Sequence, residues 1–253
     1  MKHRYDYYCF RFIRSIVKMF YPKIKVEGYE RIPKNDAVIV ANHCKMNGPI
    51  CAELFMPDNC YIWCAGEMMK LKEVPHYAYN DFWSEKPRFL RPFYKLLSYI
   101  ISPLSVCVFN NARTLPVYHD MRVLSTFKTS VGMLKDGKCM VVFPEKNEQN
   151  NNILCHFQDR FVDVAKLFYK SSGKIVSFVP MYIAPNLKKI VVGEPIEFDA
   201  DNDIEKERKR ICDTLSERIT KMAVSLPQHV VIPYNNIPKR RYLTNKDVNE
   251  VAK

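Results

Sequence analysis

Short apolar runs that alternate with amphipathic helical segments constrain the fold of this chain more than any other feature. Apolar residues recur every three or four positions in the segments between and after these runs, as a helix buried on one face requires. Strands that alternate with helices are typical of α/β layering. We therefore expect an α/β protein with a mostly parallel central sheet flanked by helices. The candidate buried strands are AVIVA (37–41), YIWCA (61–65), CMVVF (139–143) and IVSFVPMYI (175–183), and the candidate helices cover 121–134, 161–168 and 204–222.

The length of 253 residues and the composition indicate a globular protein with one main domain. Hydrophobic residues make up 47% of the chain and charged residues 26%, and a chain of this length can bury a sizeable core. We expect a basic amphipathic helix over residues 1–25, one α/β domain over 26–235, and a loose, basic polar tail over 236–253.

The expected N-terminal helix combines an apolar stripe with basic residues. Apolar side chains recur at helical spacing from Phe12 to Phe20, while Arg11, Arg14 and Lys18 face elsewhere. A basic amphipathic helix with aromatic residues suits a membrane interface. An ordinary amphipathic helix packed on the domain produces the same pattern, so both interpretations stay open.

A second apolar stretch, residues 96–109, is shorter than the roughly 18–20 residues of a spanning helix and contains Pro103. It predicts either a buried core segment or a segment that dips into one leaflet. The N-terminus lacks the apolar core and the small-residue cleavage site of a signal peptide. We therefore expect a cytoplasmic protein that associates peripherally with the inner face of the membrane.

The net charge of +12 favours an anionic partner, which could be nucleic acid, anionic lipid or a phosphorylated substrate. No nucleic-acid-binding motif is recognisable, so we expect no nucleic acid. Glycine is scarce at 7 residues, and neither glycine-rich phosphate-binding motif occurs. The 9 cysteines include no CxxC pair and their odd number does not fit a closed disulfide framework, so we expect reduced thiols and no metal site.

Chemically active side chains follow two of the expected strands. Asn42 and His43 come directly after residues 37–41, and Glu145 follows residues 139–143. Ligands of open α/β sheets bind outside the carboxyl ends of the strands. If the two strands are parallel neighbours, His43 and Glu145 open onto one crevice. A third passage, residues 115–122, adds His119 and Arg122, and together these groups indicate acid–base chemistry on an anionic or acyl substrate.

The order of these pieces resembles the glycerolipid acyltransferase family, whose bacterial representative makes phosphatidic acid from lysophosphatidic acid. The resemblance covers about residues 26–230 and implies that family's fold and activity. An acyl thioester, acyl-CoA or acyl-carrier protein, would be the co-substrate, without a further cofactor. The similar segments are GYERIPKNDAVIVANHCKMNGP (28–49), PVYHDMR (116–122), VVFPEKNEQ (141–149), FVPMYI (178–183) and GEPIEF (193–198).

The resemblance implies that His43 is the general base on the acceptor hydroxyl, but the chain departs from the family pattern nearby. The family's aspartate five residues after the histidine, which orients the ring, is Gly48 here. Asn47 could hydrogen-bond an imidazole nitrogen, yet it cannot stabilise an imidazolium as a carboxylate does. In the serine-protease triad, replacement of the orienting aspartate by asparagine costs roughly 10⁴ in turnover.

The phosphate-binding positions of the family also differ. Lys146 follows Glu145 where the family has glycine and then a threonine and an arginine, and it supplies charge without a bidentate fork. His119 stands where the family has an arginine, with Arg122 close by. We expect His43 and Glu145 to be catalytic, and Asn47, His119, Arg122 and Lys146 to bind substrate.

The resulting expectation is an enzyme that transfers a fatty acyl group to a hydroxyl or amine acceptor, lysophospholipid-like, without a covalent enzyme intermediate. A catalytically impaired protein of the same fold that binds lipid or a partner is the alternative, and the loss at Gly48 favours it. A third hypothesis, a nucleic-acid-binding protein, is supported by the net charge alone.

Overall fold

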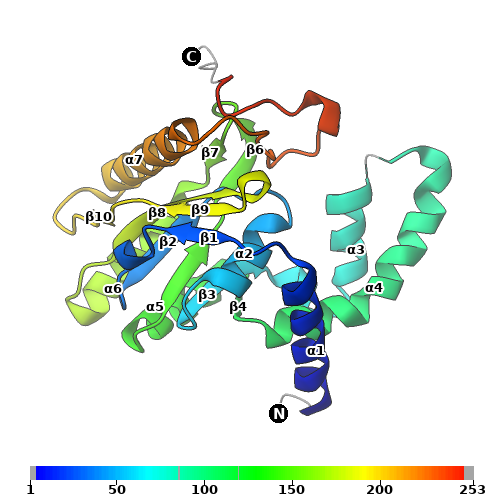
Figure 1. Cartoon of the computed structure of the whole chain (residues 1–253). Coiled ribbons are helices and arrows are strands. Elements are labelled where there is room, and N and C mark those ends of the chain that lie inside the picture. Colours follow the sequence, from blue (N-terminus) through cyan, green and yellow to red (C-terminus); the bar gives the residue numbers. More distant parts are fainter. Residues whose placement is uncertain (1–3, 85, 119, 248–253) are drawn as a thin grey trace. The chain divides into compact units, whose positions relative to one another are not determined.

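The computed structural model describes residues 4–84, 86–118 and 120–247, and the chain divides into two compact units (Figure 1). The small unit consists of residues 1–21 and 63–126, and the large unit consists of residues 22–62 and 127–253. The small unit combines the N-terminal helix with a long segment from the middle of the chain. The expected domain over 26–235 spans that middle segment and most of the large unit, and it stays a prediction.

A mostly parallel sheet forms the centre of the large unit, as the sequence predicts. The strand order is β1-β9-β8-β2-β5-β3, continuing to β4 (Thr114–Val117), and β10 pairs with β8. Parallel pairs join β2 to β5, β2 to β8, β3 to β5 and β1 to β9, whereas β9 and β10 are antiparallel to β8. The strands are β1 (Lys25–Glu27), β2 (Ala37–Ala41), β3 (Cys60–Ala65), β5 (Cys139–Val142), β8 (Ser177–Ala184), β9 (Lys189–Val192) and β10 (Ile196–Glu197).

The strand β2 lies in the interior of this sheet, because its sequence AVIVA offers no polar face. All five of its residues are buried, and it has parallel neighbours on both sides. Continuous β-branched and small apolar residues are what a strand covered on both faces requires. The carboxyl ends of β2 and β5 therefore lie at the same edge of the sheet.

Three helices, α5, α6 and α7, follow the expected periodic patterns, and α5 and α6 each start two residues later than predicted. In α7 the N-cap residue Asp203 accepts hydrogen bonds from the N–H groups of Glu205 and Lys206, and Ile211, Leu215 and Ile219 are buried. The helices are α2 (Asn47–Phe55), α5 (Val123–Lys135), α6 (Asp163–Ser172) and α7 (Ile204–Ser225); short 3₁₀ turns cover Tyr29–Arg31, Asp159–Val162, Pro185–Leu187 and Lys239–Arg241.

A hairpin that the sequence did not predict follows Glu145. The strands β6 (Glu145–Gln149) and β7 (Cys155–Phe157) pair antiparallel. Their sequences, EKNEQ and CHF, lack the alternation of apolar and polar residues that marks a strand. The pairing is therefore visible only in the structure.

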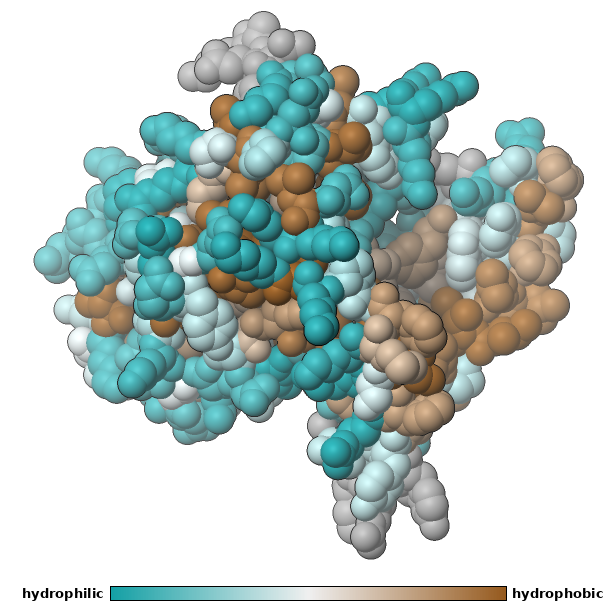
Figure 2. All heavy atoms as spheres, in the orientation of Figure 1, coloured by the Kyte–Doolittle hydropathy of each residue, from teal (hydrophilic) through white to brown (hydrophobic). Residues whose placement is uncertain are grey.

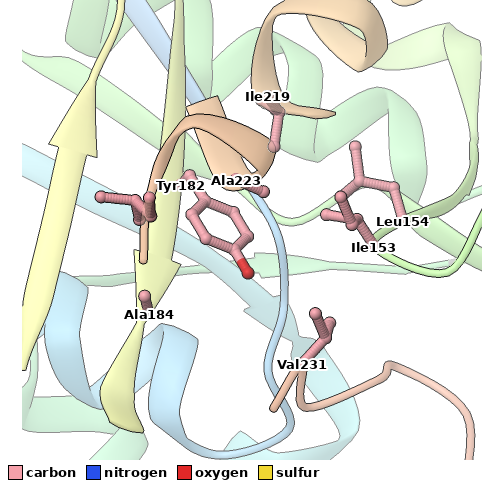
Figure 3. Close-up of a cluster of buried hydrophobic side chains, with 8 residues drawn as sticks. Ile153, Leu154, Tyr182, Ala184, Ile219, Ala223 and Val231 are labelled. Carbon is pink, nitrogen blue, oxygen red and sulfur yellow. The ribbon is translucent and has the colours of Figure 1, made fainter. Parts of the chain in front are cut away.

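The C-terminal arm, defined here as residues 227–247, is packed against the large unit, whereas a loose tail was expected. Asn245 is fully buried; its side chain donates to the carbonyl oxygens of Ala223 and Leu226 and accepts from the N–H of His229. Figure 3 shows Val231 of the arm in a hydrophobic cluster with Tyr182 of β8 and residues of α7. A buried, fully bonded asparagine fixes the path of the arm.

The small unit consists mainly of helices. In it α1 (Arg4–Phe20) and α3 (Val74–Ala78) both pack against α4 (Arg91–Asn111). The hydroxyl of Ser105 in α4 donates to the carbonyl oxygen of Met68. Its remaining elements are β4 (Thr114–Val117), 3₁₀ turns at Gly66–Met69 and Arg88–Leu90, and a π-helical turn at Tyr79–Trp83.

Among residues 96–109 of α4 only Ser98, Ser102 and Ser105 are buried, so the stretch does not form the buried core segment that was one of the two expectations. Leu96, Tyr99, Ile100 and Leu104 are each more than half exposed. In the described part of the chain, the segment Arg88–Asn111 is one helix whose length and apolarity, with a mean hydropathy of 1.4, would allow it to cross a membrane.

Candidate active site

The amide of Asn42 fixes the end of β2 in the large unit. Its Oδ1 accepts the N–H of Ile183 at 2.7 Å, and its Nδ2 donates to the carbonyl oxygen of the same residue at 3.1 Å. The side chain thus continues the backbone pairing of β2 with β8 beyond the last strand residue. Because Asn42 is buried, these bonds replace the water that its amide would otherwise need. His43 leaves the sheet from this fixed point.

The loop after His43 holds two consecutive residues in the left-handed region. Cys44 has φ 47° and Lys45 has φ 57°. For residues with a side chain this conformation costs roughly 1–2 kcal/mol each, and such strain is concentrated at functional sites. Burial raises the pKa of the Cys44 thiol well above its ordinary value, and the thiol donates to the carbonyl oxygen of Ile183. Cys44 is therefore a protonated, structural thiol.

The imidazole of His43 is held between two aromatic rings. Phe143 lies 5.3 Å from it and Tyr234 lies 5.5 Å from it, centroid to centroid, both in edge-to-face contact. Its Nδ1 is buried and has no hydrogen-bond partner among the residues that the structure describes. Burial lowers the pKa of His43 below its ordinary 6.5, so the ring is neutral at pH 7. A neutral imidazole can act as a base. Aromatic rings orient the imidazole of His43, whereas an aspartate orients it in the family that the sequence resembles.

The glycine at position 48 is required by the backbone around His43. A Cβ atom on Gly48 would lie 2.3 Å from the carbonyl oxygen of His43 and 2.9 Å from a ring carbon of Phe143. Its N–H donates to the His43 carbonyl oxygen at 3.0 Å. A carboxylate at this position is therefore sterically incompatible with the loop. The neighbouring Asn47 donates from Nδ2 to the carbonyl oxygen of Cys44, which closes the turn.

Glu145 lies beside His43, as the strand-end argument predicts, but its carboxylate binds backbone. Oε1 accepts the N–H of His43 at 2.7 Å, and Oε2 accepts the N–H of Cys155 at 2.8 Å. Only 3% of the residue is exposed, and burial raises its pKa to about 7 although the two N–H groups favour the charged form. Glu145 thus joins the His43 loop to the β6–β7 hairpin.

The remaining predicted residues are engaged within the protein or lie elsewhere. Lys146 pairs with Glu148 at 2.6 Å. Arg122 belongs to the small unit, where Asp120 binds its guanidinium at 2.7 Å and Glu73 lies at 3.4 Å. This pairing with Arg122 lowers the pKa of Asp120 to about 2. His119 lies outside the described residues.

Sequence reasoning missed two residues that shape the site, and it named Asn42 without assigning it a role. Phe143 is the last residue of a predicted strand, so its position was a usable signal. Tyr234 comes from the C-terminal arm, and nothing in its local sequence indicates a contact with His43.

The arrangement of the sheet, with a histidine and a glutamate after neighbouring parallel strands, is that of an acyltransferase-like α/β fold. The chain is similar to the crystal structure of the 1-acyl-sn-glycerophosphate (LPA) acyltransferase PlsC from Thermotoga maritima. The TM-score is 0.51, the sequence identity is 15%, and the similarity covers 90% of this chain and 86% of that chain. This likeness confirms the fold expected from the sequence. No protein-family model matches the chain, and no curated protein matches it.

The pKa of the His43 imidazole should depend on its contact with Tyr234. Because burial lowers the pKa of the imidazole, Tyr234→Leu should expose the ring and raise that pKa toward 6.5. In the folded wild type His43 binds fewer protons than in the unfolded chain, so its contribution makes the free energy of unfolding rise as the pH rises to about 6.5. The pKa is measured by NMR titration of the imidazole protons. Tyr29→Leu, at an exposed tyrosine of the same unit, is the control; equal pKa values in both variants contradict the prediction.

Proposed function

We propose that this protein is an acyltransferase that moves a fatty acyl group from acyl-CoA or acyl-carrier protein to the hydroxyl, or amine, of a lysophospholipid-like acceptor. The observation that carries the proposal is a neutral, fixed imidazole, His43, at the carboxyl end of β2 in a fold shared with an LPA acyltransferase. Glu145 holds the backbone of that histidine at the same edge.

In the proposed reaction His43 acts as the general base. The imidazole takes the proton of the acceptor hydroxyl while the oxygen attacks the thioester carbonyl carbon. The new C–O bond forms, the C–S bond breaks, and the thiolate leaves and takes the proton from the imidazolium. No acyl group is attached to the protein at any step. Since the contacts of the His43 ring are aromatic, its imidazolium is stabilised less than one paired with a carboxylate.

An assay of the wild-type protein tests the proposed acyl transfer directly. Incubation with acyl-CoA and a panel of lysophospholipid, glycerol-phosphate and amine acceptors should release thiol only when a suitable acceptor is present. Two results contradict the proposal. One is thiol release that does not depend on an acceptor, and the other is no thiol release with any acceptor from either acyl-CoA or acyl-carrier protein.

The alternative function is a lipid-binding protein of the same fold. The ion pairs that Arg122 and Lys146 form favour this alternative.

An apolar surface on the small unit supports association with a lipid bilayer. Figure 2 shows hydrophobic residues gathered over α4. Thirteen Lys and Arg residues against six Asp and Glu residues in this unit favour an anionic bilayer. We place the protein at the inner face of the membrane on this basis. The large exposed apolar side chains of these helices are Tyr7, Tyr8, Phe12, Ile16, Met19 and Phe20 on α1, Phe89 just before α4, and Phe93, Leu96, Tyr99, Ile100 and Leu104 on α4.

Substitution of this surface should weaken binding to vesicles. The double variant Leu96→Ser/Ile100→Ser removes two exposed side chains whose burial in lipid contributes about 1.5–3 kcal/mol each. We expect the partition coefficient onto vesicles containing anionic lipid, measured by co-sedimentation, to fall on the order of 10²-fold. Leu167→Ser, at an exposed leucine of α6, should leave it unchanged. Equal binding by both variants and the wild type contradicts the membrane assignment.

A further inference from the structure

A small cavity adjoins Glu145 in the large unit, between the β6–β7 hairpin and the C-terminal arm. Its volume is about 90 Å³, several times the roughly 10–15 Å³ that a cavity needs to hold one water molecule. It therefore accommodates a group of a few heavy atoms. The polar residues that line it include Glu145, Gln149, Asn152, Asn235, Arg241 and Tyr242.

Two donors of this cavity have no acceptor among the described residues. The Nδ2 of Asn152 is buried and has no partner in residues 4–84, 86–118 and 120–247, while the Oδ1 of the same amide accepts from Gln149 Nε2 at 3.4 Å. The guanidinium of Arg241 makes no hydrogen bond or ion pair with any residue in the described part of the chain. Native proteins rarely leave a buried donor unsatisfied. Arg241 is exposed, and its guanidinium together with the buried N–H group of Asn152 suits a ligand that carries several oxygen acceptors.

The charges around the cavity favour an anion. Glu145 is the one carboxyl among the lining residues, and both of its oxygens already accept backbone N–H groups. Neither oxygen therefore forms an ion pair with Arg241. The Nζ of Lys45 lies 2.8 Å from the hydroxyl of Tyr242, a lining residue, and adds positive charge at this side.

We propose that this cavity binds the phosphate of a phosphorylated acceptor, with Arg241 and the Nδ2 of Asn152 as its ligands. Arg241 offers the bidentate fork that suits phosphate oxygens and that Lys146 lacks. Tyr234 lines the same cavity and contacts the His43 ring, so one aromatic ring connects the cavity to the candidate base. Assigning the phosphate to the acceptor rests on the proposed function; the binding of phosphate itself does not.

Binding measurements on the full chain test the site without any turnover. Inorganic phosphate and glycerol 3-phosphate are titrated into the wild type and its variants by isothermal calorimetry. We expect Arg241→Ala to weaken binding of both about 10-fold or more, because charge-assisted hydrogen bonds are lost. Asn152→Asp should weaken it further by placing a carboxylate in the cavity, with circular dichroism as the check on folding.

Arg240→Ala is the matched control, since Arg240 belongs to the same 3₁₀ turn and does not line the cavity. Equal affinity in Arg240→Ala and Arg241→Ala, or no binding of either ligand to the wild type at millimolar concentration, overturns the site. Binding of inorganic phosphate with rejection of glycerol 3-phosphate and of lysophosphatidic acid overturns the assignment to an acceptor. In an active enzyme, Arg241→Ala should raise KM for a phosphorylated acceptor and leave kcat nearly unchanged.

Discussion

Replacement of His43 by alanine is expected to lower kcat/KM for acyl transfer by about 10²–10⁴-fold, the range that a positioned general base contributes. The imidazole is neutral at pH 7 because burial lowers its pKa, so the wild type carries the form that accepts a proton. Alanine leaves the backbone N–H that binds Glu145 in place. The loss should therefore fall on the chemical step, and thiol release under acceptor-limiting conditions measures it.

His156 provides the matched control for this substitution. It is an exposed histidine of β7 in the same unit, and its replacement by alanine should leave turnover unchanged. A His43→Ala protein that keeps more than a tenth of the wild-type activity would exclude this histidine as the base.

Replacement of Glu145 by leucine is expected to lower the free energy of unfolding by about 2–5 kcal/mol. The substitution leaves the N–H groups of His43 and Cys155 without their acceptor, at roughly 1–3 kcal/mol each. Acyl transfer should fall as well, since the His43 loop loses its attachment to the hairpin. Glu145→Gln keeps one acceptor oxygen and should lose less. Urea unfolding followed by circular dichroism measures these differences.

The contribution of Glu145 to the free energy of unfolding should depend on pH. Because burial raises the pKa of Glu145 from 4.5 to about 7, the folded protein holds a proton that the unfolded chain releases. Its contribution therefore makes the free energy of unfolding fall as the pH rises from about 4.5 to 7, and both variants should lose this slope. Glu148→Leu, at an exposed glutamate of the same strand, is the control. A Glu145→Leu protein as stable as Glu148→Leu would contradict the role assigned to this carboxylate.

The central sheet could be predicted because each of its main strands carries its own signal. Residues 37–41 and 139–142 are apolar on both faces, and such runs form strands only in the interior of a layered fold. The β6–β7 hairpin could not be predicted, because its strands are polar and their pairing depends on contacts with Glu145. The path of the C-terminal arm could not be predicted for a similar reason. Its anchor, Asn245, is a polar residue that is buried only because α7 offers it carbonyl oxygens.

The positions of the site residues were predictable, whereas their partners were not. Parallel neighbours place His43 and Glu145 at one sheet edge, and the structure joins them by a hydrogen bond of 2.7 Å. The sequence left open which group orients the His43 ring, and the structure shows Phe143 and Tyr234 beside it. Arg122 and Lys146 were expected to hold substrate, and carboxylates of the protein already pair with them.

The sequence by itself determined the layered α/β fold and the strand ends that carry His43 and Glu145, because apolar periodicity and strand direction are local properties of the chain. Only the tertiary structure decided what surrounds that histidine. Tyr234 is separated from it by almost the whole domain and reaches it through the anchored arm. Contacts of this kind depend on which buried groups find partners across the fold, and no pattern within a short segment records them.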